Sequence, residues 1–322
     1  MSFLGAQNSI ALGVQGIIAI DTGTGGGGGV TATQQAIFGY GTDGTTAFSM
    51  TNIVSNTGVV AGDTTGVGTG RWYLAATTYG GDKGIFGGGY TGVAWTTVTN
   101  LVSNTGVVGA NTTGVGSKFE GRAAATYGTG TAIFAYGYNT DTLSYSSISN
   151  LVSNTGVYAT DTTGVGTARS ALAATGYGTD KAIFGYGGLG FNVSTTNLVS
   201  NTGVVANDAT GVGTVRRYLA AAGYGSTGQA MFGYGYAATP LSMTNLISNT
   251  GVVATDTTGV GTARGYLAAA GYGADKAIFG YGVGVLNTAI TNLVSNTGVV
   301  ATDTTGIGTA RYGLAAAGFS YS

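Results

Sequence analysis

The sequence contains no cysteine and no histidine, a single proline, and few charged residues. Without cysteine the chain forms no disulfide bond and offers no thiolate ligand. Without histidine it lacks the commonest metal ligand and the side chain that titrates near neutral pH. We therefore expect neither a metal site nor a cofactor. With 11 basic and 12 acidic side chains the formal net charge is −1, so we expect no attraction to nucleic acid or to an anionic membrane.

Glycine is abundant instead, at 63 of 322 residues, and hydrophobic residues make up 43% of the chain. The glycines follow no collagen period, so this composition leaves enough apolar material for a folded core. At the N-terminus, polar residues such as Gln15 interrupt the apolar run, and no basic segment precedes it. We therefore expect no signal peptide and no membrane-inserted anchor.

The sequence repeats itself with a period of about 48 residues. Copies of NLVSNTGVV begin at Asn52, Asn100, Asn150, Asn197, Asn245 and Asn292. Copies of AIFGYG, or close variants, begin at Ala36, Gly84, Ala132, Ala182, Ala230 and Ala277. LAAA-like segments begin at Leu74, Arg122, Leu172, Leu219, Leu267 and Leu314. Each motif therefore occurs six times.

The two ends of the repeat region are complementary fragments of one unit. The first motif, at Ala36, has no LAAA segment before it, and the last, at Leu314, has no AIFGYG segment after it. An open solenoid would gain nothing from this phase shift, whereas a ring would be closed by it. We expect the C-terminal LAAAGFS segment to add the innermost strand to the unit that begins at Ala36.

Each unit contains four short β-rich segments, such as LAAAGYG, KAIFGYG, TNLVS and GVVAT, separated by glycine-rich turn signals. Four short strands in a unit of this length are the signature of a propeller blade. The sequence therefore predicts an all-β fold, a six-bladed β-propeller over residues 34–322. Alanine suits the crowded innermost strand, and we expect Ile37, Phe38 and their equivalents to pack between blades.

The unit resembles a kelch repeat, with an Arg before the inner strand and a strand that ends in an FGG-like element, here IFGYG. The resemblance covers residues 34–322 and implies four-stranded blades closed by the C-terminal inner strand. Most copies carry FGYG in place of the double glycine, which Gly87 and Gly88 match most closely. The tryptophan expected late in a kelch unit is absent.

The phrases DKAIFGYG, NLVSNTGVV and GVGTAR also resemble repeat proteins among the virion components of tailed bacteriophages, marine ones in particular. This resemblance implies a structural protein of a virion, in a tail, tail-fibre or capsid position, that attaches to a host surface or to neighbouring subunits. It implies no enzymatic activity.

Acidic and basic residues recur at fixed places in the unit. An Asp precedes an Arg by eight residues in five copies, and one copy has Asn111 and Phe119 instead. The acids are Asp63, Asp161, Asp208, Asp256 and Asp303, and the arginines are Arg71, Arg169, Arg216, Arg264 and Arg311. Since a catalytic residue rarely occurs in five copies, we interpret each Asp and the Arg that follows it as a structural pair.

The segment after FGYG is where the copies diverge, and it contains several aromatic residues. If the blades bring these segments to one face, exposed aromatics beside Ser, Thr and Asn can bind sugars or protein partners. The alternative is that they pack against the adjacent outer strands. The candidate residues are Phe48, Tyr90, Trp95, Tyr138, Tyr145, Phe191 and Tyr236.

Residues 1–33 lie outside the repeat region and form an N-terminal arm joined to it by the glycine run Gly25–Gly29. The run lacks the Lys of a phosphate-binding loop, so we interpret it as a tether. The apolar residues of the arm suit addition to an exposed sheet edge of another virion protein. They are Ile10, Leu12, Val14, Ile17, Ile18 and Ile20.

Three functions are compatible with these features. The first is a non-enzymatic structural and adhesion protein of a phage virion. It is docked by its arm and presents its loop face to the host surface, through a glycan or receptor, or to neighbouring subunits. The second is a free, extracellular, lectin-like propeller. The third is a glycosidase or lyase, which would need a non-repeated pair of carboxylates, and only Glu120 and Asp141 stand clearly outside the repeated acidic positions. We expect no catalytic residues.

Overall fold

The computed structural model describes residues 34–320, and all regular secondary structure in that range is β-strand. The strands form six antiparallel sheets, five of three strands and one of four. None of the described residues belongs to a helix long and apolar enough to cross a membrane. The predicted arm, including Ile10 to Ile20, lies outside the described residues. The chain is therefore an all-β protein of small repeated sheets, as its sequence predicted.

Each sheet is built from the same three segments of the repeat. The LAAA-like segments form the inner strands β3 (Ala75–Tyr79), β7 (Ala123–Tyr127), β10 (Ala173–Tyr177), β13 (Ala220–Tyr224), β16 (Ala268–Tyr272) and β19 (Ala315–Phe319). The AIFGYG segments form the middle strands β1 (Gln35–Gly39), β4 (Lys83–Gly87), β8 (Thr131–Asn139), β11 (Lys181–Gly185), β14 (Gln229–Tyr236) and β17 (Lys276–Gly280). The TNLV segments form the third strands β2 (Thr51–Val54), β5 (Thr99–Val102), β9 (Ser144–Val152), β12 (Thr196–Val199), β15 (Pro240–Ile247) and β18 (Thr291–Val294).

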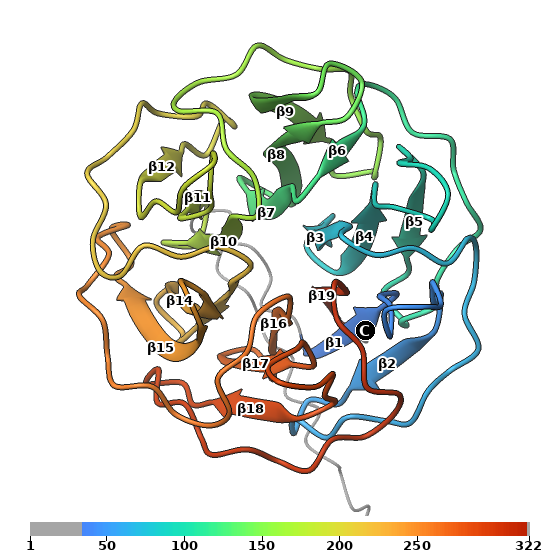
Figure 1. Cartoon of the computed structure of the whole chain (residues 1–322), viewed down its shortest axis with the longest axis vertical. Helices are drawn as coiled ribbons and strands as arrows, with labels where there is room; N and C mark the ends of the chain where they lie inside the picture. The colour runs from blue at the N-terminus through green and yellow to red at the C-terminus, as the bar shows by residue number, and fades with distance from the viewer. Residues whose placement is uncertain (1–33, 321–322) are drawn as a thin grey trace, which may run out of the picture.

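The sheets lie around a common axis, with the inner strands nearest to it (Figure 1). Each inner strand contacts the inner strands of two other sheets, in the order β3, β7, β10, β13, β16, β19 and back to β3. Alanine dominates these strands because their side chains crowd towards the axis. This is a β-propeller-like arrangement.

The C-terminal strand completes the sheet that contains the first strand of the repeat region. Strand β19 pairs with β1 in an antiparallel register that runs from Gln35 opposite Phe319 to Gly39 opposite Ala315. Strand β2 then pairs with the other edge of β1. The predicted addition of the LAAAGFS segment to the first unit is confirmed.

The predicted fourth strand does not form in the way expected. The GVVAT segment touches the third strand only through isolated bridges, such as Val60 with Val54 and Thr64 with Thr51. Between them the side chain of Asn52 donates to the carbonyl of Ala61 at 3.0 Å. This side-chain bond interrupts the ladder of backbone hydrogen bonds. The outer segment therefore lies along the third strand without forming a continuous strand. The one sheet with a fourth strand gains it elsewhere, from β6 (Phe119–Glu120), which pairs with β8.

The hydrophobic core lies between neighbouring sheets. Phe38 packs with Ile278 and Tyr281 of one neighbour, while Ile37 on the opposite side of β1 packs with Phe86 of the other. The Phe38 and Tyr281 rings meet edge to face, with centroids 5.2 Å apart. The predicted packing of these positions between units is therefore confirmed.

Fully buried arginines link neighbouring sheets at five of the six junctions. The Nε of Arg264 donates to the carbonyl of Tyr281 at 2.8 Å, and its Nη2 donates to Oδ1 of Asn292 at 2.7 Å. Its guanidinium also lies 4.4 Å from the ring centre of Tyr234, which belongs to the preceding sheet. The same arrangement recurs at Arg71, Arg169, Arg216 and Arg311.

The predicted pairing of each Asp with the Arg eight residues later is wrong. Asp256 does not pair with Arg264. It lies 3.7 Å from Arg216, the equivalent arginine one repeat before Arg264, which belongs to the same sheet as Asp256. Asn245 bridges the two, because its Nδ2 donates to Asp256 while its Oδ1 accepts from Arg216. The eight-residue spacing crosses from one sheet to the next, whereas the true partners meet when the outer segment folds back over the third strand.

The exceptional repeat shows which residues act together. Phe119 stands in the arginine position, and Gly88 replaces the tyrosine on which that arginine would stack. Arg122, three positions later, fills the space, with its guanidinium 4.2 Å from the Phe119 ring and its Nη1 donating to the Tyr158 hydroxyl. Asn111 belongs to a different network, that of Arg71, so the two substitutions do not remove a single pair.

We predict that Arg264→Met destabilises the protein by about 3 kcal/mol, because the Asn292 Oδ1 and the Tyr281 carbonyl are left buried without a donor. Urea unfolding measures this change. Lys118→Met is the control, since its ion pair with Asp141 is exposed and contributes less than about 1 kcal/mol. Equal effects of the two substitutions would contradict the role given to the buried arginines.

We predict a steep loss of stability in acid. Burial raises the pKa of Asp63, Asp208 and Asp303, but hydrogen bonds from neighbouring Thr and Asn side chains outweigh it and hold each pKa below the usual value. A lowered folded pKa stabilises the protein above the unfolded value of about 3.9, and this contribution is lost as pH falls through the folded pKa. The melting temperature should be level above about pH 5 and fall below about pH 4.

Asp303→Asn provides the matched control for this prediction. Asn111 shows that an amide fits the same position, where its Oδ1 accepts from Asn100 Nδ2 at 3.1 Å. The variant should stay folded and lose less of its melting temperature on acidification than the unsubstituted protein. Identical acid profiles for the two proteins would show that these carboxylates do not control acid unfolding.

Candidate functional site

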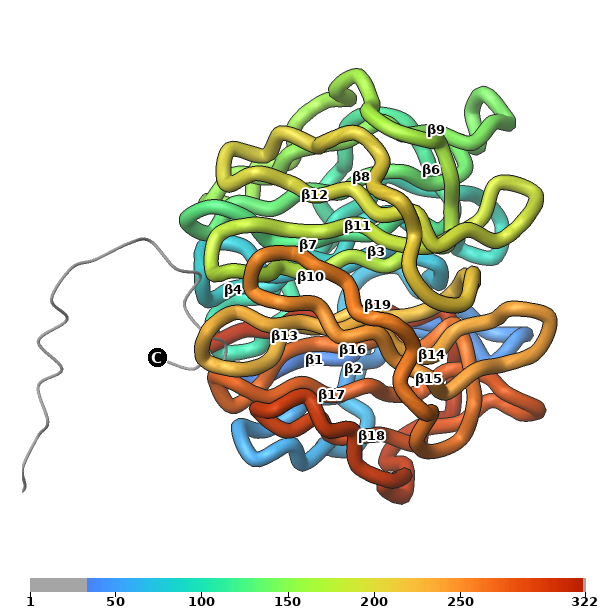
Figure 2. Tube along the Cα trace, turned by 90° about the vertical axis from the view of Figure 1, so that its left-hand side faces the viewer, coloured from blue at the N-terminus to red at the C-terminus, as the bar shows by residue number. Residues whose placement is uncertain are grey.

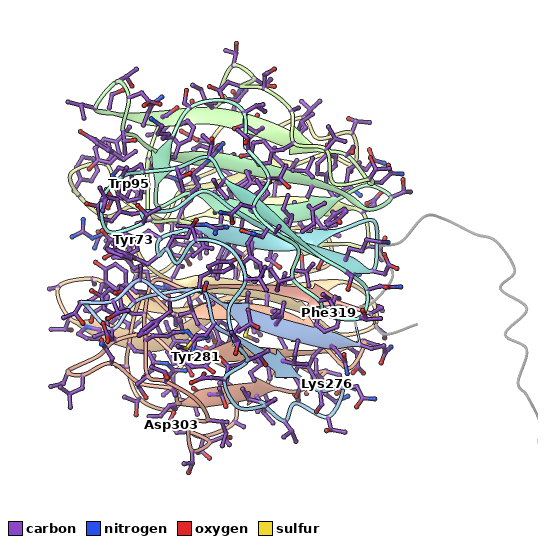
Figure 3. All side chains as sticks on the ribbon, turned by 90° about the vertical axis from the view of Figure 1, so that its right-hand side faces the viewer. Tyr73, Trp95, Lys276, Tyr281, Asp303 and Phe319 are labelled. Atoms are coloured by element: carbon purple, nitrogen blue, oxygen red, sulfur yellow. The ribbon has the colours of Figure 1, made fainter. Side chains whose placement is uncertain are left out.

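The sheets end in turns at two opposite faces of the molecule, seen from the side in Figure 2. Tyr73 and Trp95 lie at one face, and Lys276 and Phe319 lie towards the other (Figure 3). We call the first the loop face, because it carries the divergent segments that follow the middle strands, such as residues 89–96. We call the second the hairpin face, because the turns between inner and middle strands lie there, including the ion pair of Asp275 and Lys276.

Three of the predicted aromatic residues join a cluster at the loop face. Trp95 lies 5.0 Å from Tyr90 and is stacked on Tyr73 at 6.4 Å between ring centroids. Tyr236 contacts the same cluster through Tyr266, at 5.7 Å. The remaining members of the cluster are Trp72, Tyr218 and Tyr312.

The other predicted residues lie apart from this cluster. Tyr138 and Tyr145 pack on each other at the end of the hairpin formed by β8 and β9, with centroids 5.3 Å apart. Phe191 is 65% exposed, whereas Phe48 is half-buried. The structure therefore divides the seven residues into three that gather, two that form a local pair, and two that stand separately.

The centre of the cluster was missed by the sequence analysis. Tyr73, Tyr218 and Tyr266 each stand two residues after a buried arginine, in the segment that leads into an inner strand. The equivalent residues in the other repeats are Gly121, Ala171 and Gly313. This variation between copies is a usable signal in the sequence, and it lies outside the divergent segment that follows the FGYG motif.

These six equivalent residues form a continuous chain of backbone hydrogen bonds that we call the collar. The amide of Tyr73 donates to Gly313, that of Gly313 to Tyr266, and that of Tyr266 to Tyr218, at 2.7 to 2.9 Å. The series continues from Tyr218 to Ala171 and from Ala171 to Gly121, each at 2.8 Å. The collar therefore holds the aromatic cluster in a fixed position.

The collar tyrosines have a strained backbone. Tyr73, Tyr218 and Tyr266 have φ values of 56°, 55° and 54°, in the left-handed region that glycine adopts freely. A non-glycine residue there costs roughly 1 kcal/mol or more. Since Gly121 and Gly313 occupy equivalent places at φ 63°, packing of the scaffold does not require a bulky residue. Ala171 has the same left-handed backbone at φ 56° with only a methyl group, so the strain belongs to the collar, and the rings of the three tyrosines are an addition to it.

A small cavity of about 80 Å³ lies beside the collar. Tyr73, Tyr218 and Tyr266 line it together with Glu120, and buried leucines of the inner strands form its wall. Burial raises the pKa of the Glu120 carboxyl. Burial and the neighbouring Tyr312, Tyr218 and Glu120 raise the pKa of Tyr73, so its hydroxyl stays protonated at neutral pH.

The two non-repeated carboxylates considered for catalysis belong to different surroundings. Asp141 accepts from the backbone amide of Lys118 at 3.0 Å and lies 3.5 Å from its Nζ. Glu120 lines the collar cavity, and no other carboxylate from residues 34–320 lines it. The structure therefore gives these two residues separate contacts and brings no second acid to Glu120 in the cavity.

A larger cavity of about 660 Å³ runs between the inner strands and reaches the hairpin face. Its walls are mostly Ala, Gly and Thr, with Lys181, Asp275 and Lys276 near the turns. Several threonine hydroxyls form hydrogen bonds within the cavity wall. For example, Thr126 Oγ1 donates to the carbonyl of Thr78 at 2.6 Å. This cavity therefore presents small, largely uncharged groups.

In comparisons with known proteins, no protein-family model and no curated protein matches the chain. The site is therefore interpreted from its own geometry.

We predict that Trp95→Ala lowers the free energy of unfolding by about 2 kcal/mol, because the indole packs against Tyr90 and Tyr73. Phe191→Ser should change it by less than about 0.5 kcal/mol, since that ring is mostly exposed. Thermal or urea unfolding of both variants measures the difference. A large effect at Phe191 would assign it to packing instead of to the free surface.

Proposed function

We propose that this chain is a non-enzymatic structural and adhesion protein, a six-bladed, kelch-like β-propeller with one anchoring face and one recognition face. In the specific form of the proposal it is a tail- or capsid-associated component of a bacteriophage virion. Residues 1–33 dock to another virion protein, and the loop face meets a host glycan, a receptor or a neighbouring subunit.

Two observations support closure into six blades. Each of the six sheets repeats the same inner, middle and third strand, and the first sheet takes its inner strand from the C-terminus. Each inner strand also has an inner-strand neighbour on both sides. Closure of this kind leaves few free sheet edges, which suits a rigid display protein.

The observation that carries the functional proposal is the separation of the two faces. The carbonyl of Gln34, the first amino acid after the proposed arm, accepts from the amide of Gly273 in a hairpin-face turn. The aromatic cluster with Tyr73 and Trp95 lies at the opposite face (Figure 3). An anchor attached on one side leaves the other free to meet a partner.

The aromatic composition of the loop face supports recognition of a partner. Tyrosine and tryptophan provide a large contact area at a low entropic cost, which is why they are enriched in binding surfaces. Phe191, Leu286 and Val285 are also strongly exposed in this set of segments. None of them belongs to the motifs that build the repeated sheets.

Two variants in the native particle test the proposal. Deletion of residues 1–33 should abolish incorporation into particles while leaving the repeat region folded. A loop-face variant, Tyr90→Ala combined with Phe191→Ser, should be incorporated normally but lower attachment to host cells at least about tenfold, as removal of two aromatic anchors predicts. Normal incorporation of the deletion variant would disprove the proposed anchor.

A free, extracellular, lectin-like propeller is the second candidate. The exposed Phe191 beside Asn192 and the half-buried Tyr90 and Trp95 beside Thr residues favour it. A glycan array with the purified protein tests this function. A glycan that binds should lose affinity when Trp95→Ala is introduced. An array without any bound glycan would leave the virion proposal as the better one.

A further inference from the structure

We propose that the collar cavity is a binding site for an alkylammonium cation, either a small free amine or a lysine side chain of a protein partner. This site is independent of particle attachment, so the two proposals can fail separately. The shape of the cavity, its unpaired carboxylate and three tyrosines that the repeat does not require support this site.

The cavity combines an apolar wall with an aromatic and acidic rim. Buried Leu172, Leu219 and Leu267 belong to its wall, while Tyr266 and Glu120 lie among its polar lining residues. Its volume of about 80 Å³ exceeds the roughly 30 Å³ that one water molecule occupies in the liquid. The space therefore fits a small group with an apolar part and one polar end.

The cavity holds one carboxylate, Glu120, that has no direct partner among the described residues. The Glu120 carboxylate forms no hydrogen bond or ion pair with any residue from 34 to 320 in this structure. Arg122 also lines the cavity, but its guanidinium is turned to the Tyr158 hydroxyl and the Phe134 carbonyl, at 3.0 and 2.9 Å. A ligand with a positive charge would supply the missing partner.

One tyrosine ring that lines the cavity already contacts a cation of the protein itself. The guanidinium of the exposed Arg217 lies 5.2 Å from the ring centre of Tyr218, which is itself stacked on Tyr266 at 3.8 Å. Tyrosine rings attract ammonium groups as well, and desolvation strengthens the attraction. Arg217 does not line the cavity, so it does not occupy the space proposed for a ligand.

The repeat supplies the reason for treating these tyrosines as functional. All six collar positions have a left-handed backbone, but only Tyr73, Tyr218 and Tyr266 carry a ring, whereas the other three positions hold glycine or alanine. Since the scaffold does not require a large side chain at these positions, the three rings are available for another role. An alkylammonium ion would match each part of the cavity. The leucines would contact the alkyl chain, the tyrosine rings would contact the cation, and Glu120 would balance its charge.

The experiment titrates the isolated full-length protein with n-butylammonium, tetramethylammonium and n-butanol at constant ionic strength, followed by ligand-detected NMR and tryptophan fluorescence. Trp95, which is stacked on Tyr73, provides the optical signal. Saturable binding of either ammonium ion, at least about tenfold tighter than that of butanol, is the expected result. Tighter binding of butylammonium would indicate a lysine side chain, and tighter binding of tetramethylammonium a quaternary amine.

Two substitutions locate the site. Glu120→Gln should weaken ammonium binding at least about tenfold, whereas Asp141→Asn, a carboxylate near β6 that is already paired with Lys118, should leave it unchanged. Tyr266→Gly introduces the residue found at two equivalent positions, so the fold should be retained while binding weakens. Melting curves of the variants verify folding.

Three results would overturn the proposal. They are equal affinity for butanol and butylammonium, unchanged affinity in Glu120→Gln, and no saturation by either ammonium ion below about 10 mM. Because each result comes from the isolated protein, none of them bears on incorporation into particles.

Discussion

The whole arrangement depends on a buried cation placed between two sheets. Each arginine stacks on a tyrosine of one sheet and donates to an asparagine and a backbone carbonyl of the next, as Arg264 does with Tyr234, Asn292 and Tyr281. A buried charge is costly unless its hydrogen bonds are satisfied. This requirement fixes the relative position of neighbouring sheets more closely than apolar packing alone, and it explains why Tyr234 accepts a left-handed backbone at φ 63°.

The same repetition that builds the scaffold makes candidate functional positions visible. Glycine or alanine is sufficient at a collar position that only continues the series of backbone hydrogen bonds, as at Gly121 and Ala171. Tyr73, Tyr218 and Tyr266 depart from that minimum and gather around one carboxylate, Glu120. The internal copies of the chain therefore act as controls for one another, and departures from the common pattern distinguish candidate binding residues from those that build the sheets.

Much of the fold could be predicted from the sequence, because repeated motifs of alternating small and apolar residues define strands locally. The prediction of a fourth strand was wrong, since it could not include the Asn52 side chain that takes the Ala61 carbonyl from the ladder. The Asp–Arg assignment was wrong for a related reason. Asp256 and Arg216 are separated by nearly a repeat and meet only when the outer segment folds back over β15.

The sequence by itself determined the all-β class, the repeat, the inner position of alanine and the pairing of the C-terminal segment with the first unit, because these follow from local pattern and phase. It also identified Tyr90, Trp95 and Tyr236 as candidates. Only the tertiary structure decided that these residues meet Tyr73, Tyr218 and Tyr266 beside Glu120. Those residues come from different repeats, and their distances are set by the packing of whole sheets, which no local pattern encodes.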